Sequence, residues 1–117
     1  MTKQQFCYIV AFLAQAYLTG KPSRGVDGPD GRKDIDDDFD PRASSDIFTI
    51  NFSTPARVTA NKNGNYGDAI IEGQSIRIEL NFSGDKLIQA EAPGFDMYKI
   101  NISGRRVTIN DFDYEVY

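Results

Sequence analysis

The sequence has 117 residues, of which 40% are apolar, and this is enough for one domain with a single core. Thirteen lysines and arginines against 17 acidic residues give a net charge of −4, which creates no general field for holding nucleic acid or an anionic membrane. With no histidine and a single cysteine, the composition excludes a Ser-His-Asp or Cys-His relay, zinc sites built from histidine and cysteine, and an intramolecular disulfide.

Residues 1–20 are predicted to form an amphipathic helix that packs on the rest of the domain. Thr2 and Gln5 have the spacing of a capping box, and Gly20 followed by Pro22 supplies a stop. The apolar side chains expected to face the core follow helical spacing, and they are Phe6, Ile9, Val10, Leu13, Ala16 and Tyr17. The opposite side of the helix carries Gln4, Tyr8, Ala11, Gln15 and Leu18.

A cleaved secretory signal is the alternative interpretation of the same segment. Lys3 precedes the apolar run 6–13, and Ala14-Gln15-Ala16 resembles a cleavage site made of small residues. Because Gln4 and Gln15 interrupt the apolar surface, the pattern favours a helix retained without cleavage, and the compartment stays undetermined. The apolar run is shorter than the ~20 residues that cross a bilayer, so no membrane span is predicted.

Residues 21–45 are predicted to be an acidic linker or arm rich in glycine and proline, since neither strand nor helix periodicity survives there. The alternating aspartates 34, 36, 38 and 40 are spaced like the first ligands of an EF-hand calcium loop. However, Phe39 stands where that loop needs glycine, and Ser45 stands where it needs its terminal glutamate. We therefore predict no metal ligands, and whether the linker binds a cation weakly stays open.

Residues 46–117 are predicted to form an antiparallel β domain. Its clearest strand covers 74–82, where apolar and polar side chains alternate. Asn63-Gly64, Ser83-Gly84 and Ser103-Gly104 predict hairpin turns, and a change of phase predicts a bulge or turn at Asn110-Asp111. The chain is thus expected to be mainly β (α+β), with one helix and a meander of about six to eight short strands forming a small sandwich or barrel.

No motif predicts catalysis, and we expect no catalytic residue and no cofactor. The acidic residues of the β domain offer carboxylates for acid–base chemistry, but their spacing singles out no pair. Gly64 to Gly67 lacks the lysine of a phosphate-binding loop. Cys7 has no histidine to activate it, so we interpret it as a small apolar side chain.

The leading hypothesis is a non-catalytic protein-interaction or assembly module, in a viral or an extracellular setting. Its partner is expected to be another protein or copies of itself, with no direct contact to nucleic acid or a membrane. A solvated arm has little use for apolar side chains, and the run 110–117 alternates apolar and acidic residues. We expect the partner contacts to come from these two segments, at Ile35, Asp36, Asp37, Asp38, Phe39, Phe112 and Tyr114.

Two alternatives remain open. The first is a small soluble acidic inhibitor whose carboxylates imitate nucleic-acid phosphates and block a host or defence protein. The aspartates 34–40 and the acids of the C-terminal run support this alternative, but a net charge of −4 is weak for such a mimic. The second is a ligand-binding β-barrel, which requires an internal cavity.

Overall fold

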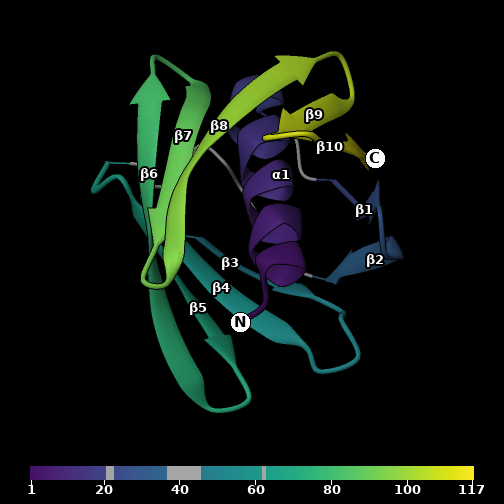
Figure 1. The fold of residues 1–117 in the computed structure, drawn as a ribbon, viewed down its shortest axis with the longest axis vertical. Coiled ribbons are helices and arrows are strands. Elements are labelled where there is room, and N and C mark those ends of the chain that lie inside the picture. The colour runs from purple at the N-terminus through teal and green to yellow at the C-terminus, as the bar shows by residue number, and fades with distance from the viewer. Residues whose placement is uncertain (21–22, 37–45, 62) are drawn as a thin grey trace.

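The computed structural model describes residues 1–20, 23–36, 46–61 and 63–117. In these residues one helix, α1 (Lys3–Thr19), is followed by ten strands that form a closed barrel (Figure 1). The strands are β1 (Gly25–Gly28), β2 (Gly31–Asp36), β3 (Asp46–Ile50), β4 (Ala56–Asn61), β5 (Tyr66–Ile71), β6 (Gln74–Ser83), β7 (Lys86–Ala92), β8 (Phe95–Ser103), β9 (Arg106–Ile109) and β10 (Phe112–Val116).

Each strand pairs in antiparallel fashion with the strand that follows it in the sequence, and β1 pairs with β10 to close the barrel. This confirms the predicted class of one helix followed by an antiparallel meander. The described residues contain somewhat more strands than the predicted six to eight, because eight strands follow residue 45 and two more precede it.

The turns between strands lie where the sequence predicted them, with one change of detail. Gly84 and Gly104 adopt φ of 65° and 60°, a left-handed conformation that glycine tolerates without steric cost. Asn110 adopts φ of 55° between β9 and β10, as expected from the change of phase. In the turn before β5 the positive φ belongs to Asn65 and not to Gly64.

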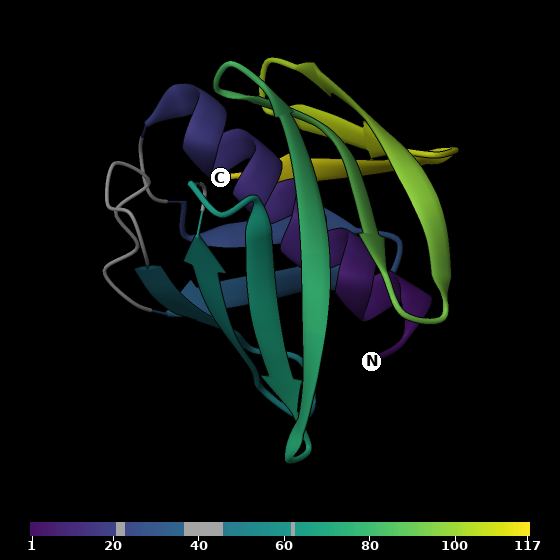
Figure 2. The same cartoon turned by 90° about the vertical axis from the view of Figure 1, so that its left-hand side faces the viewer.

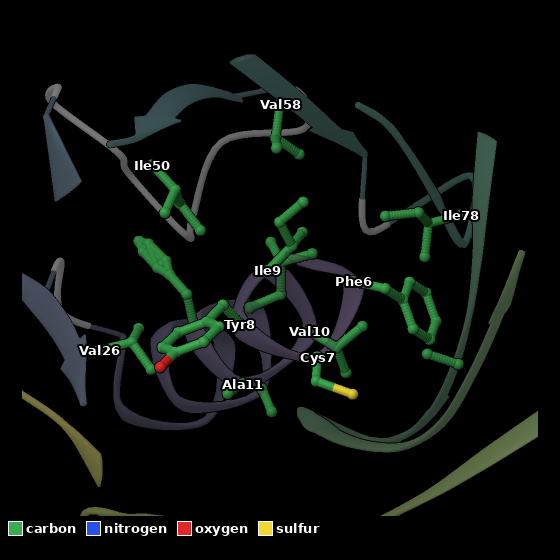
Figure 3. Close-up of a cluster of buried hydrophobic side chains, with 14 of the residues drawn as sticks. Phe6, Cys7, Tyr8, Ile9, Val10, Ala11, Val26, Ile50, Val58 and Ile78 are labelled. Carbon is green, nitrogen blue, oxygen red and sulfur yellow. The ribbon is translucent and has the colours of Figure 1, made fainter. Parts of the chain in front are cut away.

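Helix α1 lies inside the barrel, as the view in Figure 2 shows. The structure confirms that Phe6, Val10, Leu13 and Tyr17 are buried. The predicted amphipathic character is wrong, because every residue from Phe6 to Tyr17 is buried, including those of the side that carries Ala11. In Figure 3 the side chains of α1 project in all directions around the helix axis toward the surrounding strands.

Aromatic rings fix the helix against several walls of the barrel. Phe12 contacts the ring of Phe48 on β3 edge-to-face, with ring centroids 4.4 Å apart. Phe6 stacks on Phe95 of β8, and Tyr17 meets Phe82 of β6. Edge-to-face and stacked pairs of this kind add to the stabilisation that burial alone provides. The helix is therefore held from opposite sides and forms the centre of the core.

The ends of α1 follow the sequence signals. The Thr2 hydroxyl accepts from the Gln5 amide, and the Gln5 side chain accepts from the Thr2 amide, which confirms the capping box. Gly20 closes the helix in the left-handed conformation, with φ of 70°. Near this end the buried Gln15 side chain donates to the carbonyl of Gly104 at 2.7 Å. Its Oε1 has no hydrogen-bond partner among the described residues.

Part of the predicted linker belongs to the barrel, which corrects the boundary at residues 21–45. Residues 25–28 and 31–36 form the hairpin of β1 and β2, while the calcium-loop positions 38, 40 and 45 lie outside the described residues. The strand signal was missed because β1 supplies only one large inward side chain, Val26. At Gly28 the ring of Tyr114 occupies the space where a side chain would stand, since an added Cβ would lie 2.5 Å from its Cδ1.

Candidate partner-binding surface

A row of four charged side chains crosses the outer face of the barrel where it closes. The strand registers place Arg32 of β2 opposite Asp27 of β1, Asp27 opposite Glu115 of β10, and Glu115 opposite Arg106 of β9. All four residues are exposed. The two carboxylates therefore face each other at the centre of the row, an arrangement that destabilises a sheet unless a cation relieves it.

The arginines of this row relieve the repulsion only in part. Arg106 lies 3.9 Å from the Glu115 carboxylate, and both side chains are at least half exposed, so the pair is screened by water. Arg32 forms an ion pair with Asp34 on its own strand, at 3.0 Å, and so directs its charge away from Asp27. The centre of the row thus stays acidic.

A shallow cleft of about 350 Å³ lies beside the two carboxylates. It is lined by Asp27, Gly28, Pro29, Arg106, Asp113 and Glu115. The Asp113 carboxylate on β10 accepts a hydrogen bond at 2.7 Å from the hydroxyl of Thr108 on the neighbouring strand β9. This bond fixes the position of the carboxylate. The cleft therefore presents three carboxylates and one guanidinium, a combination that attracts cationic groups.

Two aromatic side chains lie near these acids: Phe112 at the start of β10 and Tyr117 directly after its end. Phe112 begins β10 and is half exposed, at 50%, the highest value among the large apolar side chains of the described residues. Tyr117 follows β10, with its hydroxyl 3.5 Å from the carboxylates of both Asp27 and Glu115. Partial loss of hydration and these two carboxylates raise the pKa of Tyr117, so its hydroxyl stays protonated and available as a donor.

The structure separates the predicted partner-binding residues into different environments. Ile35 is half-buried and packs against the core. Asp36 is exposed and accepts from the Asn51 side chain at 2.7 Å. Val26 of β1 lies between Lys33 of β2 and Val116 of β10. Measured from this level of the sheet, Asp36 lies toward one end of the barrel and Phe112 toward the other, so the two predicted residues are not brought together. Asp37, Asp38 and Phe39 lie outside the described residues.

Tyr114 is a correction to the predicted set. It is completely buried, and its hydroxyl donates to the side chain of Gln4 at 2.9 Å. Its ring meets the ring of Tyr8 edge-to-face, with centroids 5.1 Å apart, and burial raises the pKa of its hydroxyl. Along β10 the even positions 114 and 116 point into the barrel, so Tyr114 belongs to the core and is not offered to a partner.

A second acidic pair escaped the sequence analysis. Glu79 of β6 lies directly opposite Glu91 of β7, beside an open cleft of about 430 Å³ that Arg77 and Pro93 also line. A bulge near Phe82 shifts the register by one residue, and this shift brings the two glutamates together. A hydrogen bond with Glu79 raises the pKa of Glu91. Periodicity alone does not reveal a pairing that depends on such a shift.

The one cysteine is poorly placed for nucleophilic chemistry. Cys7 is buried inside the barrel, and burial raises the pKa of its thiol, which disfavours the reactive thiolate. Among the described residues no group of three or more acidic or cysteine side chains is arranged to hold a metal ion. The described helix is also not long and apolar enough to cross a membrane.

No family model, curated protein or solved structure matches the chain.

Proposed function

We propose that the chain is a non-catalytic protein-interaction module that binds its partner through the outer face of β1, β9 and β10. We call this face the acidic face and define it by Asp27, Asp113, Glu115 and Tyr117, with Phe112 at its edge. The observation that carries the proposal is the half-exposed Phe112 at the first position of β10. Phe112 shares the register of the inward Tyr114 and lies opposite Ile109, so it is exposed at the end of the β9–β10 hairpin, beside the outward Asp113. An exposed aromatic anchor surrounded by charged residues is typical of the centre and rim of protein interfaces.

The interior of the barrel supports a surface role over a ligand-binding role. A barrel that carries a small ligand keeps a cavity in its centre. Here the centre is occupied by α1, whose residues Phe6 to Tyr17 are all buried against the strands. The clefts described above lie on the outside, where a partner protein has access to them.

A phosphate mimic is the second candidate function. Asp27, Asp113 and Glu115 line one cleft, and this group of carboxylates supports a role as a phosphate mimic. The presence of Arg106 in the same cleft works against it, because a mimic depends on a strong field of one sign. The arm aspartates 37 and 38, which the sequence pattern also assigns to this role, lie outside the described residues.

Site-specific photocrosslinking tests the proposed face even when the partner is unidentified. A photoreactive phenylalanine analogue replaces Phe112, and in a second variant it replaces Ile70 on β5, across the barrel from β10 and similarly exposed at 45%. We expect a discrete crosslinked product from position 112 in cells of the source organism and none from position 70. The same products from both positions, or none from position 112, would contradict the proposal.

Salt dependence then separates the two candidate functions. Contacts centred on Phe112 are largely apolar, so the yield of the crosslink should change little between low and moderate salt. A mimic of phosphates should lose its partner steeply, because exposed charges are screened beyond a Debye length of about 8 Å at physiological ionic strength. Loss of the product on Asp113→Asn together with a steep salt dependence would favour the mimic.

A further inference from the structure

The turn between β4 and β5 contains an asparagine whose side chain is open to attack by the chain itself. Of the seven asparagines in the sequence, only Asn63 is followed by glycine. Asn63 and Gly64 are both exposed in this turn. Because glycine has no Cβ, the residue after Asn63 presents no side chain that would hinder the approach of its backbone nitrogen. Asn63 is therefore the asparagine of this chain that the following nitrogen reaches most easily.

The structure holds that nitrogen in place by contacts within the turn. The Gly64 amide donates to Oδ1 of Asn61 at 2.8 Å. Gly64 also lies against the ring of Tyr66, since an added Cβ would stand 2.5 Å from its Cε1. The guanidinium of Arg77 lies 4.3 Å from the centroid of the same ring and fixes it from β6. The proton of the Gly64 amide is thus directed at the Asn61 side chain.

We propose that Asn63 is a site of spontaneous deamidation and that Asn61 limits the rate by holding the Gly64 nitrogen. The Gly64 amide loses its proton to solvent, and its nitrogen forms a bond to Cγ of Asn63. The bond from Cγ to the side-chain nitrogen breaks, and that nitrogen takes up a proton and leaves as ammonia. Water then opens the succinimide ring at either of its two carbonyls, which leaves aspartate or isoaspartate at position 63. The only co-reactant is water.

The hydrogen bond to Asn61 opposes the first step of this reaction. It stabilises the protonated form of the Gly64 amide and keeps the nitrogen directed toward Asn61, away from the geometry needed for attack. The net contribution of one such bond corresponds to a change of about two- to tenfold in rate. The product adds a negative charge to the turn, and isoaspartate also lengthens the backbone where Asn61 and Tyr66 set the register of β4 and β5.

Peptide mapping by mass spectrometry, after storage of the full chain in mildly alkaline buffer, tests the site. Asn65 is the internal control, because it is exposed in the same turn but precedes the bulky Tyr66. We expect aspartate and isoaspartate to form faster at Asn63 than at Asn65. We also expect faster conversion of Asn63 in urea, where the turn is unfolded. No product at Asn63, or equal conversion at the two asparagines, would overturn the proposal.

Asn61→Ala tests the protecting bond, and Asn61→Asp restores an acceptor at the same position. In the folded chain, Asn61→Ala should convert Asn63 about two- to tenfold faster, while Asn61→Asp should convert it no faster than the unmodified chain. Asn81→Ala replaces an exposed asparagine on β6 and is the matched control, which should leave the rate unchanged.

Urea separates the effect of the fold from that of the local sequence. With the turn unfolded, Asn61→Ala and the unmodified chain should convert Asn63 at the same rate. An acceleration by Asn61→Ala that persists in urea would contradict the protecting role, as would the absence of any acceleration in the folded chain or an equal one in Asn61→Asp.

Discussion

The enclosed helix and the acidic face lie on the two sides of the same barrel wall, and they obey different constraints. Inside, each position of α1 from 6 to 17 is buried, so side-chain volume decides which residue is tolerated. Outside, Asp27 stands opposite Glu115, an arrangement that no requirement of packing explains. The contrast teaches that one strand serves two environments: Tyr114 and Val116 of β10 are buried in the core, while Asp113 and Glu115 are exposed on the face that we propose binds a partner.

The largest expected effect comes from removing volume inside the barrel. Leu13 is completely buried, so Leu13→Ala removes its contacts and leaves a cavity at the centre. We expect a loss of about 3 to 5 kcal/mol in the free energy of unfolding, measured by urea denaturation. Phe112→Ala at the edge of the acidic face should shift the midpoint only slightly, because half of this side chain is already exposed. A larger shift for Phe112→Ala than for Leu13→Ala would break the distinction between the two regions.

Ala11→Gln tests whether the helix is enclosed on every side. An amphipathic helix would tolerate this change, because the sequence places Ala11 on the more polar side. In the structure Ala11 is completely buried, so the longer amide both overfills the site and loses its hydration. We expect a loss of about 2 to 4 kcal/mol by the same measurement. An unchanged unfolding midpoint would mean that this side of α1 faces solvent.

Gly28→Ala tests the close packing of strand β1 against the buried ring of Tyr114. An added Cβ would lie 2.5 Å from the Tyr114 ring, so either the ring or the β1–β2 hairpin must move. We expect a loss of about 1 to 3 kcal/mol in thermal or urea unfolding. Gly67→Ala is the matched control, since its Cβ would meet its nearest neighbour at 3.6 Å, an ordinary contact. Similar losses in both variants would point to a general sensitivity of glycine positions in strands.

The smallest expected effect concerns the exposed pair Glu79 and Glu91. The pKa of Glu91 is raised in the folded chain, so the folded state holds that proton more tightly than the unfolded state does. Stability is therefore lost as pH rises through this raised pKa. Glu79→Gln should make the chain slightly more stable at neutral pH, and the gain should fade as pH falls toward the ordinary pKa of a glutamate. Melting temperatures of both chains across this range measure the gain, and a constant difference would contradict the assignment.

Local signals predicted much of the fold. The Thr2–Gln5 capping box, the left-handed Gly20, and the turn glycines at 84 and 104 act within a few residues of the chain, so their consequences follow from the sequence directly. The alternation of residues 74–82 similarly identified the longest strand, β6. Exposed Phe112 was also identified as a partner-binding candidate from its place in an alternating acidic segment.

Features that depend on distant contacts were missed. Tyr8 belonged to the more polar side of the predicted helix, yet it is buried because strands surround α1 completely. Gly28 shows no strand pattern because the ring that covers it comes from Tyr114, far along the chain. Glu79 meets Glu91 only through a bulge between β6 and β7, whose position follows from packing and not from periodicity.

The pairing of the first strand with the last has a consequence for biosynthesis. Helix α1 is synthesised before all ten described strands, and the strand that completes its enclosure, β10, is the last of them. The apolar surface of α1 therefore stays partly uncovered until β10 has been synthesised, a period in which aggregation competes with folding. A nascent chain truncated before residue 112 should accordingly bind chaperones through α1, and release should follow completion of β10.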